Sequence, residues 1–458
     1  MMPPHIGKTG GESSVRQSND GMLGAMPVPR LVVTMSLPIM LSMLISAVYN
    51  LVDSVYVAQY SDEAFLALSY AYPIQMLLVS FCSGIGVGFS AIFSRRLGEG
   101  DQEQAASAVC HGFFLYGLCW LLFLLFALTG AAPFLRLSTE DPSVARQGAQ
   151  YLLICCGLSI GTCMQFLTER ILQAMGRPAG FMIVQGSGAI LNLILDPIFI
   201  FVLDLGVAGA AAATVIGQIS GALIGFWLVY RLRRQLPIRL RGFRPRGEML
   251  AEMGRVAAPA VVMQSLSSFM SLGLNQLLTR WSESAVFVLG AYFKLQTFIF
   301  MPIFGISSGL IPILSYNYGS GALRRVSASV RFGQQFTAVL SLSGALLLSL
   351  LASPLLRSAF RASPEALAMG APALRIIALS FFFAGTSIIF CSAFQSLGRS
   401  RWSLLVALLR QILLLLPAAA LLLALKPALV WAAFPLSELI SCFAAALLYR
   451  RTIQKQLL

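Results

Sequence analysis

The sequence has little charge and almost no histidine. Of its 458 residues, 57% are hydrophobic and only 11% are Asp, Glu, Lys or Arg, whereas a soluble protein carries about 25% charged residues. Such a composition argues against a soluble globular fold. The two histidines, His5 and His111, argue against a haem held by paired histidines.

The eight cysteines do not occur at spacings typical of metal sites. This pattern favours small buried hydrophobic side chains over ligands. The chain also has no HExxH run and no evident nucleophile–base arrangement, so we predict that it is not an enzyme and uses no cofactor. Five of the cysteines fall in apolar segments, namely Cys82, Cys110, Cys155, Cys156 and Cys163.

What the sequence does have is a series of long apolar runs. Runs of about 20 residues recur along nearly the whole chain, and each is long enough to cross a bilayer. We predict an all-α polytopic membrane protein with twelve transmembrane helices. Their predicted ranges are 31–57, 64–94, 106–132, 144–172, 179–202, 206–231, 256–280, 285–316, 328–352, 370–396, 402–424 and 428–449.

The basic residues predict the orientation of these helices. The net charge is +14, and with the N-terminus inside, 23 of the 32 Lys and Arg lie in cytoplasmic loops or helix ends. This positive-inside bias accounts for the basicity through orientation and anionic lipid, without nucleic-acid binding. We therefore expect both termini to be cytoplasmic, in a multi-pass protein of the plasma membrane.

The two halves of the chain resemble each other. An even number of six helices per half gives both halves the same orientation, so we predict two lobes related by a parallel pseudo-twofold repeat. An offset of 222 aligns QAMGR at 173–177 with QSLGR at 395–399. Earlier in the halves an offset of 221 aligns Pro38 with Pro259, Gln75 with Gln296, Gly84 with Gly305, Gly88 with Gly309 and Gly98 with Gly319.

The repeat and the charges together predict four parts. Residues 1–27 are polar and rich in Gly and Ser, and we expect a disordered cytoplasmic tail without a cleavable signal peptide. Residues 28–232 form the first lobe, 233–254 a basic cytoplasmic linker, and 255–458 the second lobe. Two lobes that rock against each other suit alternating access better than they suit an enzyme or a receptor.

One intramembrane acid needs a physical explanation. Asp196 lies in the run LNLILDPIFIF, and an Asp near the bilayer centre costs about 2.5–3.5 kcal/mol on insertion scales. Asn192 is one turn earlier on the same helix face, and Pro197 cannot donate to the carbonyl of Leu193. These hard oxygens suit a proton or an alkali cation such as Na⁺.

Two other helices place polar oxygens at a similar depth. At 1.5 Å per residue, Asp53 lies about 9 Å below the outer boundary, and Asp196 and Thr214 about 12 Å below it. Tyr49 and Asn50 lie within one turn of Asp53, and Asn50 is a candidate for the substrate cavity. Three alternatives stay open: an interfacial Asp53, an internal helix–helix hydrogen bond for Asp196, and back-bonding for Thr214.

The second half does not repeat these acids, because Leu274 aligns with Asp53 and Leu416 with Asp196. Its own embedded charges are candidates for a substrate cavity or for internal pairing, and we considered a Lys294–Glu438 pair. Arg410 either reaches the inner interface or faces the cavity and favours anionic substrates.

Two features of the first half carry further expectations. Pro38 predicts a kink in the first helix, and switching of that helix is a hypothesis. The adjacent Glu169 and Arg170 are expected to form a local charged helix end.

Several runs together resemble the multidrug and toxic compound extrusion (MATE) family. They are LPIMLSMLISAVYNLVDSVYVAQ, LQAMGRP, GAILNLILDPIFIFVLDLGVAGAAAATVIGQ and YFKLQTFIFMPIFGISSGLIPILSYNYGSG. The resemblance covers about residues 28–455, and within the family it is similar to the DinF-like branch. Glu169 departs from the amide that DinF-like relatives can carry there.

The resemblance implies a twelve-helix antiporter, expected to be monomeric, that exports organic compounds in exchange for inward Na⁺ or H⁺. It implies coupling-ion ligands at Asp53, Asn192, Asp196 and Thr214, with Tyr49 beside them. The runner-up is a flippase for lipid-linked precursors or polysaccharides, which would need a cationic cavity; Lys294 and Arg410 are the embedded cations that such a cavity would use. A channel is disfavoured because no filter-like stretch occurs.

Overall fold

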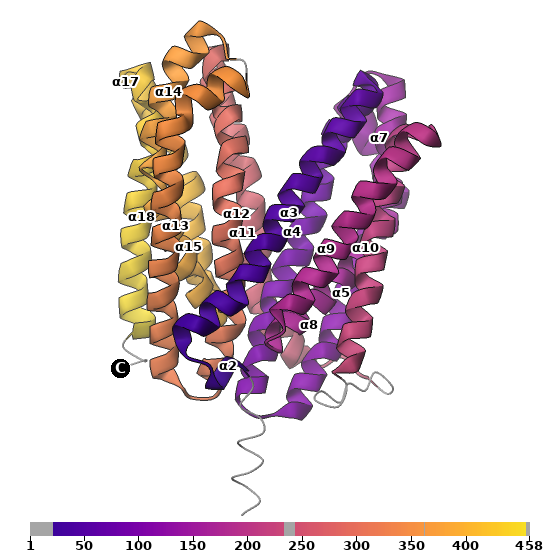
Figure 1. The fold of residues 1–458 in the computed structure, drawn as a ribbon, viewed down its shortest axis with the longest axis vertical. Helices are drawn as coiled ribbons and strands as arrows, with labels where there is room; N and C mark the ends of the chain where they lie inside the picture. The colour runs from indigo at the N-terminus through magenta and orange to yellow at the C-terminus, as the bar shows by residue number, and fades with distance from the viewer. Residues whose placement is uncertain (1–21, 233–242, 361, 455–458) are drawn as a thin grey trace, which may run out of the picture.

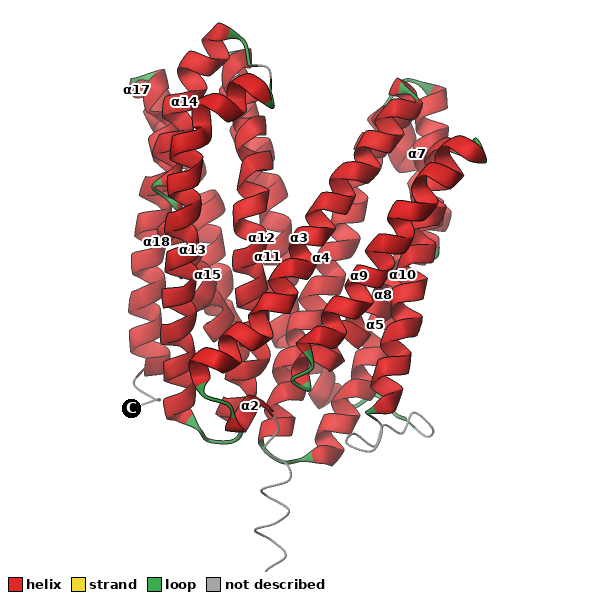
Figure 2. Ribbon diagram, in the orientation of Figure 1, coloured by secondary structure: helices red, strands yellow, loops and turns green. Residues whose placement is uncertain are grey.

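Every regular element of the described chain is a helix (Figure 2). The computed structural model describes residues 22–232, 243–360 and 362–454. Ten helices are long and apolar enough to cross a membrane, and two further helix pairs each make one span bent by 43°, which gives twelve. The predicted all-α, twelve-span fold is therefore confirmed. Most of the expected tail and residues 233–242 of the linker lie outside the described residues.

A short helix, α2, precedes the first lobe. The first helix of this lobe begins at Val28 and its last helix ends at Arg231. The elements are α2 (Met22–Ala25), α3 (Val28–Tyr60), α4 (Asp62–Gly98), α5 (Gln102–Thr129), α6 (Ala131–Ser138), α7 (Pro142–Gly157), α8 (Ile160–Ala174), α9 (Pro178–Pro197), the π-helical turn η1 (Ile198–Val202) and α10 (Gly206–Arg231).

The second lobe repeats this order with more interruptions. Its elements are α11 (Gly247–Thr279), α12 (Glu283–Gly319), α13 (Leu323–Ser358), α14 (Pro364–Ala378), α15 (Phe381–Ser396), α16 (Ser400–Leu408), η2 (Leu409–Leu413), α17 (Leu415–Leu425), η3 (Pro427–Ala432), α18 (Ala433–Tyr449) and η4 (Arg450–Gln454).

Many helices begin or end a few residues from their predicted bounds, and two differences change the predicted division of the chain into parts. Helix α11 begins at Gly247 instead of 256, with Glu248 in its first turn, where a carboxylate is stabilised by the helix dipole. The end of the expected basic linker is therefore helical. Likewise, Met22–Ala25 of the expected tail is a helical turn, because the Leu23 carbonyl accepts hydrogen bonds from Asn317 and Arg325 at 3.1 and 3.2 Å.

The bent spans show how closely the local structure repeats. Pro142 starts α7 after Asp141, whose carboxylate accepts from the Ser143 nitrogen at 2.8 Å. Pro364 starts α14 after Ser363, whose hydroxyl accepts from the Ala366 nitrogen at 3.2 Å. Both are N-capped helices with proline in the first position, so the repeat includes the caps.

The two lobes diverge toward one end and converge at the other (Figure 1). At the converging end, α4 packs against α11 and α3 packs against α12. A β-carbon on Gly84 would lie 2.7 Å from the Val261 nitrogen, and one on Gly305 would lie 2.7 Å from the Met40 Cα. The 221-residue offset aligns Gly84 with Gly305 and Met40 with Val261, so the two contacts correspond to each other in the repeat. These two helix pairs, which we call the seam, are related by the twofold axis.

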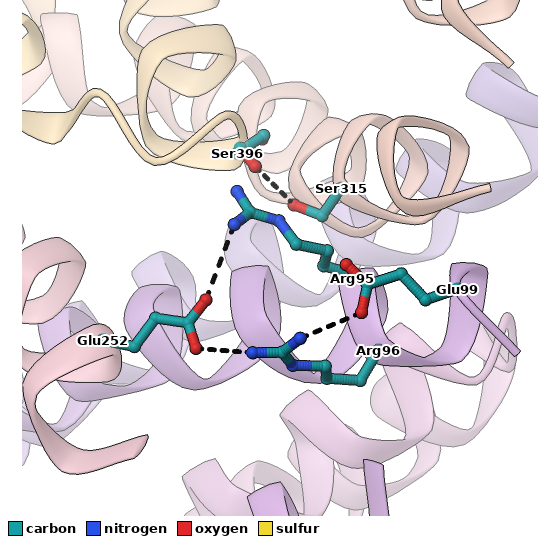
Figure 3. Close-up of polar contacts among 6 residues, drawn as sticks. All are labelled: Arg95, Arg96, Glu99, Glu252, Ser315 and Ser396. Atoms are coloured by element: carbon teal, nitrogen blue, oxygen red, sulfur yellow. Dashed lines mark hydrogen bonds and ion pairs between the residues drawn. The ribbon is translucent and has the colours of Figure 1, made fainter. Parts of the chain in front are cut away.

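Polar contacts close the seam where α4 ends and α11 begins. Arg95 and Arg96 of α4 converge on the carboxylate of Glu252 of α11, at 3.6 and 2.8 Å, and Arg96 also binds Glu99 at 3.0 Å (Figure 3). On the far side of Arg95, the Ser315 hydroxyl donates to the Ser396 carbonyl at 3.1 Å. Partly exposed ion pairs contribute about 0–1 kcal/mol each, which suits a reversible closure.

A buried contact also crosses between the lobes. Arg170 of α8 donates to the Ser308 hydroxyl of α12 at 2.7 Å, and Gln173 donates to the Ser308 carbonyl at 2.7 Å. Arg170 is only 5% exposed and Glu169 only 3%. The expectation of a local charged helix end was wrong, because both side chains point into the protein, where α8 meets other helices.

The close approach at Gly305 predicts a selective effect of substitution. Gly305→Val should destabilise the seam by about 1–3 kcal/mol, because overpacking forces the helices apart. Gly290→Val on the same helix is the control, because a β-carbon there meets nothing within 4 Å. The measurements are the apparent Tm in detergent and transport at equal protein amount. Equal behaviour of the two variants would contradict a tightly packed seam.

Candidate functional site

Two small residues bring α9 and α10 into backbone contact. A β-carbon on Gly217 of α10 would lie 2.6 Å from the Gly188 carbonyl oxygen and 3.2 Å from the Asn192 Cβ. Larger side chains at Gly188 or Gly217 would separate the helices. Their absence allows polar groups one turn further along, on both helices, to meet inside the first lobe.

The polar groups that meet there are those predicted from the sequence. Asn192 Nδ2 donates to Asp196 Oδ1 at 3.0 Å and to Thr214 Oγ1 at 3.3 Å. One amide group therefore links the carboxylate of α9 to the hydroxyl of α10. Asp196 is 0% exposed and Asn192 3%, so the cluster is enclosed by protein.

Helix α3 adds a second carboxylate. Asp53 is 9% exposed, and its carboxylate lies close enough to Asp196 for the two charges to repel each other. The Tyr49 side chain, one turn earlier, lies within electrostatic range of both acids and of Glu169. The structure thus brings together Asp53, Asn192, Asp196 and Thr214, with Tyr49 beside them.

Three oxygen atoms of this cluster have no hydrogen-bond donor among the described residues: Asp53 Oδ1, Asn192 Oδ1 and Asp196 Oδ2. A buried polar atom without a partner costs about 1–3 kcal/mol, and more if it is charged. A proton or a small hard cation would satisfy them, and carboxylate and amide oxygens are the ligands that such cations prefer.

The backbone near Asp196 is irregular. Pro197 has no amide hydrogen, so it cannot donate to the Leu193 carbonyl, and the π-helical turn η1 follows it at once. Irregular backbone at membrane depth is tolerated where it lines a polar site. This interruption of the helix begins one residue after Asp196, so a change in its backbone can move the groups around that carboxylate.

The remaining candidates of α3 take different positions, with Asn50 beside Tyr49 and Pro38 at the seam. Asn50 is exposed and donates to the Ser46 carbonyl at 2.8 Å. Pro38 lies inside α3, at the seam between Ser36 and Met40. A kink at Pro38 stays a prediction.

The candidates of the second lobe form a separate group. Arg410 Nη2 binds Glu438 Oε1 at 2.7 Å, and both side chains are 13% exposed. The considered Lys294–Glu438 pair is wrong, because Glu438 of α18 pairs with Arg410, which lies in the π-helical turn η2. Lys294 is exposed on α12 and has no ion pair with a described residue.

Sequence reasoning did not find a set of buried amides below the cluster. Gln165 donates to Glu169 at 2.9 Å, and the Thr162 hydroxyl donates to Gln218. Their spacing offered one signal, because Gln165 and Glu169 are one turn apart and Gln218 is one turn from Thr214. These groups extend the polar interior of the lobe along α8 and α10.

Two six-span lobes around a twofold seam, with buried unpaired oxygens in one lobe, define a polytopic membrane transporter. The family model MatE matches residues 38–198 and 259–421, one stretch in each lobe. The chain belongs to the MatE family, and it is a transporter and not an enzyme.

Curated relatives agree with this assignment. The chain is 26% identical over 402 residues to the multidrug export protein MepA of Staphylococcus aureus (strain MRSA252), covering 85% of this chain and 86% of that protein. It is also 26% identical over 417 residues to a FAD transporter of Shewanella oneidensis, covering 88% and 89%.

Solved structures show the same fold. A MATE family transporter of the MOP superfamily in its outward-facing conformation matches with a TM-score of 0.89 at 23% identity, over 95% of this chain and 97% of that one. A MATE transporter in a straight conformation matches with a TM-score of 0.88 at 22% identity, over 95% and 98%.

The three unpaired oxygens predict an ion-dependent stability. Raising Na⁺, or lowering the pH if the ion is H⁺, should raise the apparent Tm of the wild type, since a ligand at 100 times its Kd stabilises by about 2.7 kcal/mol. Asp196→Asn should lose this dependence. Asp204→Asn is the control, because Asp204 lies at the exposed end of the lobe, bonded to Tyr60 at 2.9 Å. An unchanged dependence in Asp196→Asn would refute the site.

Proposed function

We propose that this protein exports drug-like organic compounds across the plasma membrane in exchange for inward Na⁺ or H⁺. The observation that carries the proposal is the buried cluster of two carboxylates and an amide with unpaired oxygens in the first lobe. Such a cluster is costly when empty and favourable when it holds a cation. Binding of a cation therefore stabilises the conformation of the protein in which the cluster is enclosed.

Helix α3 provides a physical connection between this site and the seam. It carries Asp53 toward its outer end and Met40, which packs on Gly305, nearer its inner end. The two residues are separated by about 20 Å along the helix. Neutralising Asp53 removes its repulsion from Asp196, so α3 can move closer to α9 and change its packing on α12.

Exchange then follows from linkage. An ion shifts the equilibrium between outward- and inward-facing states only by its difference in affinity for them, and the substrate does likewise. When the ion favours the arrangement that binds substrate weakly, its entry drives substrate release. Proton or Na⁺ entry from outside thereby supplies the energy for export.

The substrate class rests on the relatives and on the balance of charge. MepA is named for multidrug export, and the Arg410–Glu438 pair leaves the second lobe without a net charge at that point. A flippase for lipid-linked anionic precursors is less well supported, because Lys294 is then the remaining embedded cation of the second lobe. Small organic compounds therefore fit these residues better than lipid-linked anionic precursors do. We propose that the exporter acts as a monomer with both termini in the cytoplasm.

Transport in proteoliposomes tests the proposal. Wild-type protein should move a fluorescent cationic dye against an imposed Na⁺ or pH gradient, and the effective gradient identifies the ion. Asp53→Asn and Asp196→Asn should reduce the gradient-driven rate to background, because neither variant can bind and release the cation. Asp204→Asn should transport like the wild type. Normal coupling in both site variants would contradict the proposal.

A further inference from the structure

Three cysteines of the first lobe converge, although they are far apart in the sequence. Cys82 of α4, Cys119 of α5 and Cys163 of α8 place their sulfur atoms within 4.8 Å of one another. The Cys82 and Cys163 sulfurs are 3.7 Å apart. The burial predicted from the sequence is confirmed for these cysteines. Their spacing gave no sign that the three side chains meet in one group, which we call the thiol triangle.

The thiol triangle is not required by the fold. All three side chains are at most 4% exposed, so they occupy a core position that apolar residues could fill. The second lobe shows this directly, because the repeat places Ile303 opposite Cys82, Gly385 opposite Cys163 and, at the 221-residue offset of Gly112 and Gly333, Leu340 opposite Cys119. There, Gly385 and Ser341 are in contact, so the same corner of the lobe packs without thiols.

The geometry of the triangle matches three sulfur ligands around one atom. With bonds of about 2.3 Å, a pyramidal three-coordinate centre such as trivalent arsenic holds its sulfurs about 3.5 Å apart, and a planar centre about 4.0 Å. The Cys82 and Cys163 sulfurs, 3.7 Å apart, lie between these values, and all three sulfurs lie within 4.8 Å of one another, so small side-chain shifts bring them into bonding range of one atom. Among the described residues, no His, Asp or Glu joins the group, so a four-ligand zinc site is not formed.

Charge decides among the soft elements that thiolates select. Three thiolates carry three negative charges, and an uncompensated charge in a buried apolar site is costly. A monovalent ion would leave two negative charges and a divalent ion one. A trivalent centre leaves none, which favours trivalent arsenic or antimony at this depth.

We propose that the thiol triangle binds trivalent arsenic or antimony, delivered as the neutral hydroxide. In the arsenic case, As(OH)₃ reacts with three thiols to form three As–S bonds and three molecules of water. Each hydroxide leaves with the proton of one thiol. No electron is transferred and no net charge enters the core.

Binding should also affect transport, because it joins three helices. Cys82 lies two residues before Gly84, which packs on Val261 at the seam, and Cys163 lies on the helix whose Arg170 contacts Ser308 across the lobes. Holding α4, α5 and α8 together restricts both contacts. Arsenic should therefore inhibit transport at a position separate from the cation site.

Binding of arsenous acid to the purified full-length protein tests the proposal. After gel filtration, elemental analysis should find about one arsenic per chain, since three thiols hold one atom, and thiol titration of the unfolded complex should find three fewer reactive thiols. Cys119→Ser and Cys163→Ala should each lower the affinity at least about tenfold, since each removes one ligand. Cys155→Ser and Cys391→Ser are controls and should bind like the wild type.

The contradicting outcomes are equally defined. Equal arsenic binding in Cys119→Ser, Cys163→Ala and wild type would overturn the site, as would tighter binding of Cd²⁺ than of arsenous acid. Dye transport without arsenic should be normal in both triangle variants, which shows that they are folded. Their transport should resist arsenic that inhibits the wild type. Because binding is measured without transport, failure of the antiport proposal would leave this test intact.

Discussion

The structure depends on one constraint, which is the burial of Asp196 inside a lobe that lies within the membrane. Its side chain is 0% exposed, and one of its oxygens has no donor among the described residues. Asn192 and Thr214 satisfy part of the cluster, but Asp53 adds a second carboxylate within range of the first. An enclosed pair of carboxylates is stable only when a proton or cation reduces their charge.

The glycine contacts link this need for a proton or cation to the packing of both lobes. Gly217 on Gly188 brings the ligands of α9 and α10 together, while Gly305 on Met40 joins α3 to the second lobe. Both contacts use the same device, a missing side chain that lets two backbones touch. A small movement of α3 at Asp53 is therefore transmitted to a seam in which backbone atoms are in direct contact.

Properties that depend on one helix at a time could be predicted from the sequence. Hydropathy predicted the twelve spans, the one-turn spacing predicted that Asn192 and Asp196 share a helix face, and the glycine offsets predicted a duplicated fold. Properties that depend on helix rotation could not. The partner of Glu438 is Arg410, which lies in a π-helical turn, and the thiol triangle unites residues 37 to 81 positions apart.

The central claim is that the ion site of the first lobe controls the angle between the lobes. Spin labels at Leu137→Cys and Leu425→Cys, on exposed positions of α6 and α17, report the separation of the outer ends by electron–electron double resonance. Saturating coupling ion should shift the distance distribution in the wild type and leave it unshifted in Asp196→Asn. The same shift in both proteins would contradict control by this site.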